Sequence, residues 1–156
     1  LVKHTNGLTS YELITEIEKS FTIVKKGSSP YSPNLTDEIS MYLRGAWYSL
    51  IALPTIIKQD CVSKLDPAIL SDNILAPILG ITDEKTDKNI VFEAGKISLT
   101  EIAEKVDTDD FEVAFILKPI PINALKEVAD NNLSMPPKST YIEPKLRSGL
   151  TIYPLE

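Results

Sequence analysis

The sequence predicts a layered α/β sandwich built on a mixed sheet, with one β-hairpin and about four helices. Three observations lead to this fold class. Residues 9–12 and 98–101 both read Ser/Thr-x-x-Glu, which is typical of a helix start because the two side chains satisfy otherwise unpaired backbone N–H groups. Short apolar segments of strand length alternate with the helical segments. Arg44-Gly45 separates two of these segments as a two-residue turn, which predicts the hairpin.

We expect the elements at these places along the chain. The segments with strand patterns are residues 1–4, 22–26, 39–43, 46–53, 89–92 and 112–117. The helices start at Thr9, Asp66, Ser98 and Pro121. Residues 112–117 form a nearly continuous apolar run, typical of a strand covered on both faces. The proline-bearing end, residues 139–153, is expected to add one or two edge strands.

Some side chains have a predicted position within these elements. Asp66 is expected to act as the N-cap acceptor of its helix, ahead of Pro67 at the first helical position. Trp47 is interpreted as a packing residue of the hairpin, since large aromatic side chains mostly serve packing. The side chains expected on the buried faces of the first and last helices are Tyr11, Ile14, Ile17, Phe21, Ile122, Leu125, Val128 and Ala129.

The length and the net charge of the chain limit the classes of protein to which it can belong. A chain of 156 residues with 43% hydrophobic residues is long enough for one domain, which we place at residues 1–156. The net charge of −6 disfavours binding to nucleic acid, because such surfaces normally carry an excess of Lys and Arg. No apolar run approaches the ~20 residues that a membrane helix needs, so we expect no membrane partner.

The scarcity of two residue types excludes several kinds of site. Cys61 is the only cysteine, which rules out an internal disulfide and a cysteine-rich zinc site. This composition fits a reducing compartment, so we expect a cytoplasmic protein. His4 is the only histidine, and most catalytic triads and histidine-based metal sites need this residue type. The sequence therefore predicts no catalytic residue and no metal ligand.

The densest polar segment lies near the end of the chain. Its candidate ligand-binding residues are Lys138, Ser139, Thr140, Lys145 and Arg147. The segment is not a P-loop, because Asn132 and Pro137 occupy the positions where that motif needs glycines with free N–H groups. Prolines stiffen the segment, so it could hold an anionic group with little loss of entropy. A rigid surface loop with solvated lysines is the alternative.

The same segment carries a resemblance to a known family. Residues 135–141, Met-Pro-Pro-Lys-Ser-Thr-Tyr, and residues 144–150, Pro-Lys-Leu-Arg-Ser-Gly-Leu, closely resemble the end of a group of bacterial and archaeal proteins. That group is the domain of unknown function numbered one thousand and fifteen, often labelled SpoOJ/ParA/ParB/RepB-like. Further similar stretches are residues 1–3, 6–8, 45–48, 66–80, 86–88 and 128–130.

The resemblance implies that this chain is the carboxy-terminal portion of a longer protein, as does its start at Leu1 rather than at methionine. The family's Asp-Gly-His-His-Arg signature, similar to a motif of ParB-like and free-serine-kinase proteins, would then lie upstream. The chain would be an accessory phosphate- or nucleotide-binding half, with no cofactor of its own and with ATP or ADP bound by the full-length protein. Its partner would be the missing N-terminal half. The alternative is a non-catalytic interaction or dimerisation module, a homodimer built through the aromatic hairpin around Trp47.

We predict negligible affinity for duplex DNA at physiological salt, because the acidic chain repels the phosphate backbone. Fluorescence anisotropy with a labelled duplex at about 150 mM salt would measure it. Non-specific binders have dissociation constants of about 10⁻⁴–10⁻⁶ M under such conditions. Sub-micromolar binding would contradict the prediction and would reveal a local basic patch that outweighs the overall charge.

Overall fold

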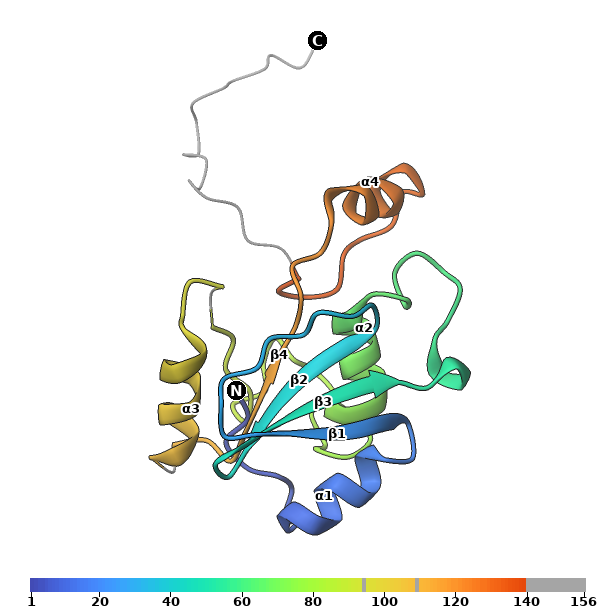
Figure 1. Ribbon diagram of the computed structural model, residues 1–156. Helices are drawn as coiled ribbons and strands as arrows, with labels where there is room; N and C mark the ends of the chain where they lie inside the picture. The colour runs from blue at the N-terminus through green and yellow to red at the C-terminus, as the bar shows by residue number, and fades with distance from the viewer. Residues whose placement is uncertain (94, 109, 140–156) are drawn as a thin grey trace.

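A computed structural model describes residues 1–93, 95–108 and 110–139. Its centre is a four-stranded sheet with the strand order β1-β3-β2-β4 (Figure 1). The strands are β1 Phe21–Gly27, β2 Glu38–Leu43, β3 Ala46–Ala52 and β4 Val113–Ile116. The α/β class and the hairpin of β2 and β3 are confirmed.

The pairing of the strands differs in one respect from the mixed sheet that the sequence predicts. All three pairings in the described part of the chain, β1 with β3, β3 with β2 and β2 with β4, are antiparallel. A parallel pair needs a crossover that returns the chain to the same end of the sheet. Here the tight hairpin reverses β3 against β2, and β4 enters beside β2 in the direction of β3.

Four α-helices accompany the sheet within the described ranges. They are α1 Ser10–Ile17, α2 Asp66–Leu70, α3 Leu99–Asp107 and α4 Ile122–Asp130, and α2 continues into a π-helical turn, Ser71–Leu75. Both predicted capping boxes are confirmed: the carboxylates of Glu12 and Glu101 accept the backbone N–H of Thr9 at 2.8 Å and of Ser98 at 2.9 Å. Among the described residues, none of these helices has the length and apolar content needed to cross a bilayer.

Several predicted details are wrong. The N-cap of α2 is Leu65, and Asp66 is already inside the helix and caps nothing with its side chain. Tyr11 is 79% exposed and Ile122 is 66% exposed, so neither lies on the buried face of its helix. The predicted burial of Ile17 in α1 and of Val128 in α4 is confirmed, and Leu13 is buried beside Ile17. Residues 1–4 and 89–92 form no strands; they supply only isolated bridges of Val2 with Ile90 and with Val113. The edge strands expected in residues 139–153 fall almost wholly outside the described residues.

The sheet separates two apolar layers. On one face its side chains pack with α1 and with the α2 region around Ile69 and Ile74. On the other face Tyr42 and Trp47 pack with α3, and Figure 1 shows α3 on the side of the sheet away from α2. Trp47 is fully buried, with its ring 4.9 Å from that of Tyr42, so the packing interpretation of Trp47 is confirmed. The Trp47 side chain itself is therefore part of the core, and an interaction surface on the hairpin around it stays a prediction.

A buried carboxylate at the start of β2 organises the loop before it. Glu38 is fully buried, and its oxygens accept hydrogen bonds from the Tyr31 hydroxyl and from the backbone N–H groups of Asn34 and Leu35, each at 2.7 Å, and from the Ser49 hydroxyl of β3. Burial alone would raise the pKa of Glu38, but the four hydrogen bonds outweigh it and lower the pKa to about 2. The carboxylate therefore stays charged and holds residues 31–35 against the sheet.

We predict that Glu38→Gln destabilises the domain by about 2–3 kcal/mol at pH 7, because a neutral amide cannot accept from all four donors. The lowered pKa also makes the stability depend on pH. The contribution of Glu38 to the free energy of unfolding is complete above the ordinary pKa of 4.5 and is lost as the pH falls towards about 2. Urea unfolding between pH 7 and pH 2 would measure both effects.

The matched control is Glu104→Gln on the exposed face of α3, where we expect a change within about 0.5 kcal/mol. The interpretation of Glu38 fails if both variants unfold at the same urea concentration as the parent protein.

Candidate functional site

One hollow in the described part of the chain is a cleft with a volume of about 520 Å³. We use "the cleft" for this hollow, which is bounded by three segments: the end of the loop before β2, the loop before α2, and the linker from β4 to α4. Figure 1 shows where these segments run in the fold. Its lining residues are Leu35, Thr36, Asp37, Ile57, Lys58, Gln59, Lys64, Leu65, Asp66, Lys118, Pro119, Ile120, Pro121 and Ala124. Its walls combine apolar side chains with three lysines and two carboxylates.

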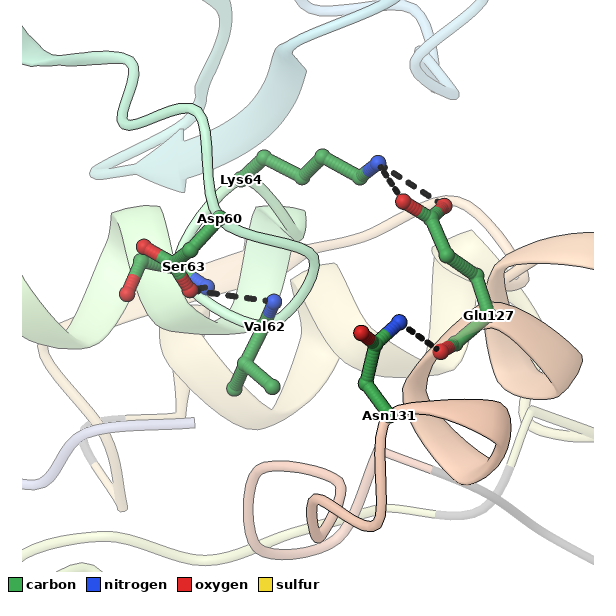
Figure 2. Close-up of polar contacts among 6 residues, drawn as sticks. All are labelled: Asp60, Val62, Ser63, Lys64, Glu127 and Asn131. Carbon is green, nitrogen blue, oxygen red and sulfur yellow. Dashed lines mark hydrogen bonds and ion pairs between the residues drawn. The ribbon is translucent and has the colours of Figure 1, made fainter.

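The wall on the α4 side rests on a small contact. α4 packs through a cluster in which the buried side chains are Cys61, Leu65 and Val128. Figure 2 shows Lys64 reaching from the loop before α2 to Glu127 on α4, with Nζ 2.7 and 2.8 Å from the two carboxylate oxygens. The Asp60 carboxylate accepts the backbone N–H of Val62 at 3.2 Å, which is visible in Figure 2, and that of Ser63 at 2.8 Å. The two bonds fix the turn that carries Lys64.

Each lysine of the cleft already meets an acceptor. Lys58 pairs with Asp72 at 2.6 Å, and Lys64 pairs with Glu127. Lys118 donates to the backbone carbonyls of Asn34 and Leu35 at 3.3 and 3.4 Å, and so bridges the linker to the loop before β2. The two ion pairs are exposed to solvent, and such pairs contribute only about 0–1 kcal/mol. A stronger anionic acceptor could therefore replace Asp72 or Glu127.

The two carboxylates of the cleft are Asp37 and Asp66. No residue in the described part of the chain donates a hydrogen bond to either carboxylate. Burial, and then the negative charge of Asp37, raise the pKa of Asp66 to about 6, whereas the charge of Lys118 acts in the opposite direction. A carboxyl group in a cleft with such a raised pKa is typical of a ligand-binding or catalytic site.

The segment predicted from the sequence lies elsewhere in the chain. Lys138 is exposed with a positive φ of 57°, and Ser139 donates its hydroxyl proton to the carbonyl of Pro136 at 2.7 Å in the same turn. Neither residue is among those that line the cleft. Thr140, Lys145 and Arg147 lie outside the described residues. Ligand binding by this segment therefore stays a prediction.

The sequence does not predict the residues of the cleft as a site. Asp37, Lys58 and Lys118 stand in three separate loops, and no spacing in the sequence links them. The sequence marks Asp66 only as a helix start. Lysines and aspartates in loops are normally solvated, so only the fold reveals that these charged residues and Lys64 face one hollow.

Two further findings bear on the kind of site. Among the described residues, no group of three or more His, Cys, Asp or Glu side chains is arranged to hold a metal ion. Comparison of the chain with models of known protein families, with curated proteins and with solved structures finds no match.

We predict that Asp66→Asn stabilises the domain at pH 7, by about 1 kcal/mol after allowance for solvent screening in the open cleft. The folded protein holds the Asp66 proton more tightly than the unfolded chain, because the pKa rises from 3.8 to about 6 on folding. The unfolding free energy of the parent protein therefore decreases as the pH rises through this range, and the Asp66→Asn variant would not show this decrease.

Urea unfolding at pH 4 and pH 7 would measure the difference, with Asp110→Asn on an exposed connector as the control. An effect of Asp66→Asn that is the same at both pH values would show that the substitution acts through packing rather than through charge.

Proposed function

We propose that this domain binds a phosphorylated organic ligand of the nucleotide class in the cleft, and that it serves as the accessory half of a longer nucleotide- or phosphate-handling protein. One observation carries the proposal: three lysines from two loops line a single hollow with apolar walls, in a chain with a net charge of −6. The binding of the ligand, rather than a reaction, is the function that this geometry supports.

The dimensions and the lining of the cleft suit such a ligand. Small-molecule sites typically measure about 300–1,000 Å³, and the cleft has about 520 Å³. Ile57, Leu65 and Ile120 provide an apolar wall for a base or another planar group. Asp37 and Asp66 supply acceptors for the amino or hydroxyl groups of the ligand.

The phosphate group would meet the lysines. A doubly charged phosphate is a better acceptor for Lys58 and Lys64 than the exposed carboxylates of Asp72 and Glu127, because charge-assisted hydrogen bonds to phosphate are among the strong ones. When phosphate replaces these carboxylates as the acceptor, only weak surface ion pairs are lost.

The resemblance to the ParB/serine-kinase-like proteins implies the same class of ligand, with ATP or ADP as the nucleotide of the full-length protein. In that arrangement the catalytic motif belongs to the N-terminal half, and this domain contributes binding groups. Lys138, Ser139, Thr140, Lys145 and Arg147 would add to the phosphate contacts from the end of the chain. The isolated domain would then bind a nucleotide without hydrolysing it.

We predict that ADP binds to the 156-residue chain more tightly than adenosine does, and that Lys58→Ala weakens ADP binding about tenfold by removing one charged contact. Isothermal titration calorimetry at low salt would measure both. Lys25→Ala removes an exposed charge from β1, outside the cleft, and should leave the affinity unchanged.

A second pair of variants separates direct contact from loosening of α4. Lys64→Ala and Glu127→Ala break the same ion pair, but only Lys64→Ala removes a cation from the cleft. We expect Lys64→Ala to weaken ADP binding and Glu127→Ala to leave it equal or stronger. Equal losses in both variants, or no binding of ADP by the parent chain, would overturn the proposal and favour the interaction-module alternative.

A further inference from the structure

A second, smaller hollow lies at the other end of β2 and β4. Its volume is about 280 Å³, and we call it the basic pocket. Its lining residues are Lys3, His4, Arg44, Val106, Phe111 and Glu112. They come from the segment before α1, the β2–β3 turn, the end of α3 and the residues just before β4. None of them lines the cleft.

The backbone that carries the cations of this pocket is held in place. The carbonyl of Asn89 accepts the Lys3 N–H at 2.9 Å, and its side-chain oxygen accepts the His4 N–H at 2.8 Å. The side-chain amide of Asn89 donates in turn to the His4 carbonyl at 2.9 Å. Arg44 and Gly45 have φ values of 43° and 78°, the positive values of a type I′ hairpin turn. The backbone positions of Lys3, His4 and Arg44 are therefore fixed, so binding a ligand would need to order only their side chains.

The charges in the pocket are unbalanced. In the described part of the chain, the side chains of Lys3 and Arg44 have neither a hydrogen-bond acceptor nor an ion-pair partner. Glu112 is the only carboxylate in the lining, and it is committed to Thr5, whose backbone N–H and hydroxyl both lie 2.6 Å from one carboxylate oxygen. Nearby, the Asp107 carboxylate accepts the Tyr42 hydroxyl at 2.7 Å.

The Glu112 carboxyl group is ionised and stays hydrogen-bonded to Thr5. The hydrogen bond from the Thr5 hydroxyl lowers the pKa of Glu112, against the effect of burial, and the charges of His4 and Arg44 lower it further. Glu112 is thus ionised at neutral pH but bound to Thr5. In the described part of the chain, the side chains of Lys3 and Arg44 thus face one hollow without a hydrogen-bonded acceptor, and an anionic ligand would supply one.

We propose that the basic pocket is a binding site for a phosphate group, separate from the cleft, in which Arg44, Lys3 and His4 donate to the phosphate oxygens. Arginine presents a planar fork of donors that matches two oxygens of an oxyanion. Three donor side chains suit the three terminal oxygens of a phosphate better than the two of a carboxylate. The volume admits a phosphate and a small substituent, and Phe111 and Val106 provide a wall for that substituent.

The test is a titration of the 156-residue chain with inorganic phosphate and with methyl phosphate at low ionic strength, followed residue by residue in ¹H–¹⁵N NMR spectra. We expect saturable shifts at residues 3–4, 44–45 and 111–112. If methyl phosphate binds more tightly, the ligand of the pocket is a phosphorylated molecule. If inorganic phosphate binds more tightly, the ligand is the free ion. Either result supports a phosphate site. Acetate that binds as tightly as either probe would overturn it.

The decisive variant is Arg44→Asn. It removes the guanidinium but creates an Asn-Gly turn, the sequence most favourable for a type I′ hairpin, so folding should be retained. We expect the shifts at these residues to require at least about tenfold more phosphate in Arg44→Asn and in Lys3→Gln, while the melting temperature stays within a few degrees. Lys25→Ala is the control for the loss of a positive charge elsewhere.

Lys58→Ala separates this site from the cleft. It should weaken ADP binding in the cleft and leave the phosphate-induced shifts of the basic pocket unchanged, so either proposal can fail without the other. Unchanged phosphate binding in Arg44→Asn, or the absence of shifts at residues 3–4 and 44–45 in the parent chain, would overturn the basic pocket as a phosphate site.

Discussion

The buried carboxylate of Glu38 is the interaction on which the arrangement of this domain depends. An ionised group inside a protein is tolerated only when its oxygens are fully hydrogen-bonded, and Glu38 has four donors. Three of these donors belong to residues 31–35 and one to β3, so the same charge closes the loop and attaches it to the sheet. Leu35 and Asp37, which come just before Glu38 in the chain, form part of one wall of the cleft. This wall of the cleft is therefore held in place by a single buried charge.

The opposite wall of the cleft is held by weaker forces. α4 adds one buried side chain, Val128, to the small cluster with Cys61 and Leu65, and its ion pair through Glu127 is exposed. Elements with little buried apolar area open at a lower free energy than the core of a domain. The cleft thus combines a rigid wall at Glu38 with an adjustable wall at α4. Such a combination allows a ligand to be enclosed without disturbing the sheet.

The elements that the sequence predicts well are those that depend on local chemistry. The capping boxes at Thr9 and Ser98 and the Arg44-Gly45 turn are each decided within four residues, and all three are confirmed. Errors arise where the position of a side chain depends on distant packing. Tyr11 has the spacing of a buried residue, but the sheet lies beneath Leu13 and Ile17 instead. The direction of strand pairing is likewise a tertiary property that the alternation of elements does not encode.

Neither hollow could be predicted from the sequence, for a similar reason. Lys3 and His4, in the segment before α1, lie near Arg44 because Val2 bridges Val113 and Val113 pairs with Leu43 of β2. The sequence predicts Glu38 neither as a core residue nor as an anchor, because a charged residue before an apolar strand normally faces solvent. The only hint of this role in the sequence is the presence of two polar side chains, Tyr31 and Ser49. They donate hydrogen bonds to Glu38 only after the strands have paired.

The net charge of the chain does not show where positive and negative side chains gather on this domain. The chain carries 22 acidic against 16 basic residues, which argues against a nucleic-acid surface. Several of the acidic side chains accept hydrogen bonds within the domain: Glu12 and Glu101 cap helices, Glu38 anchors a loop, and Glu112 binds Thr5. Hydrogen bonds from neutral donors hold each of these carboxylates in one orientation and keep it ionised, so its negative charge remains part of the local field. The proposed phosphate sites depend instead on where the basic side chains lie: Lys58, Lys64 and Lys118 line the cleft, and Lys3 and Arg44 line the basic pocket.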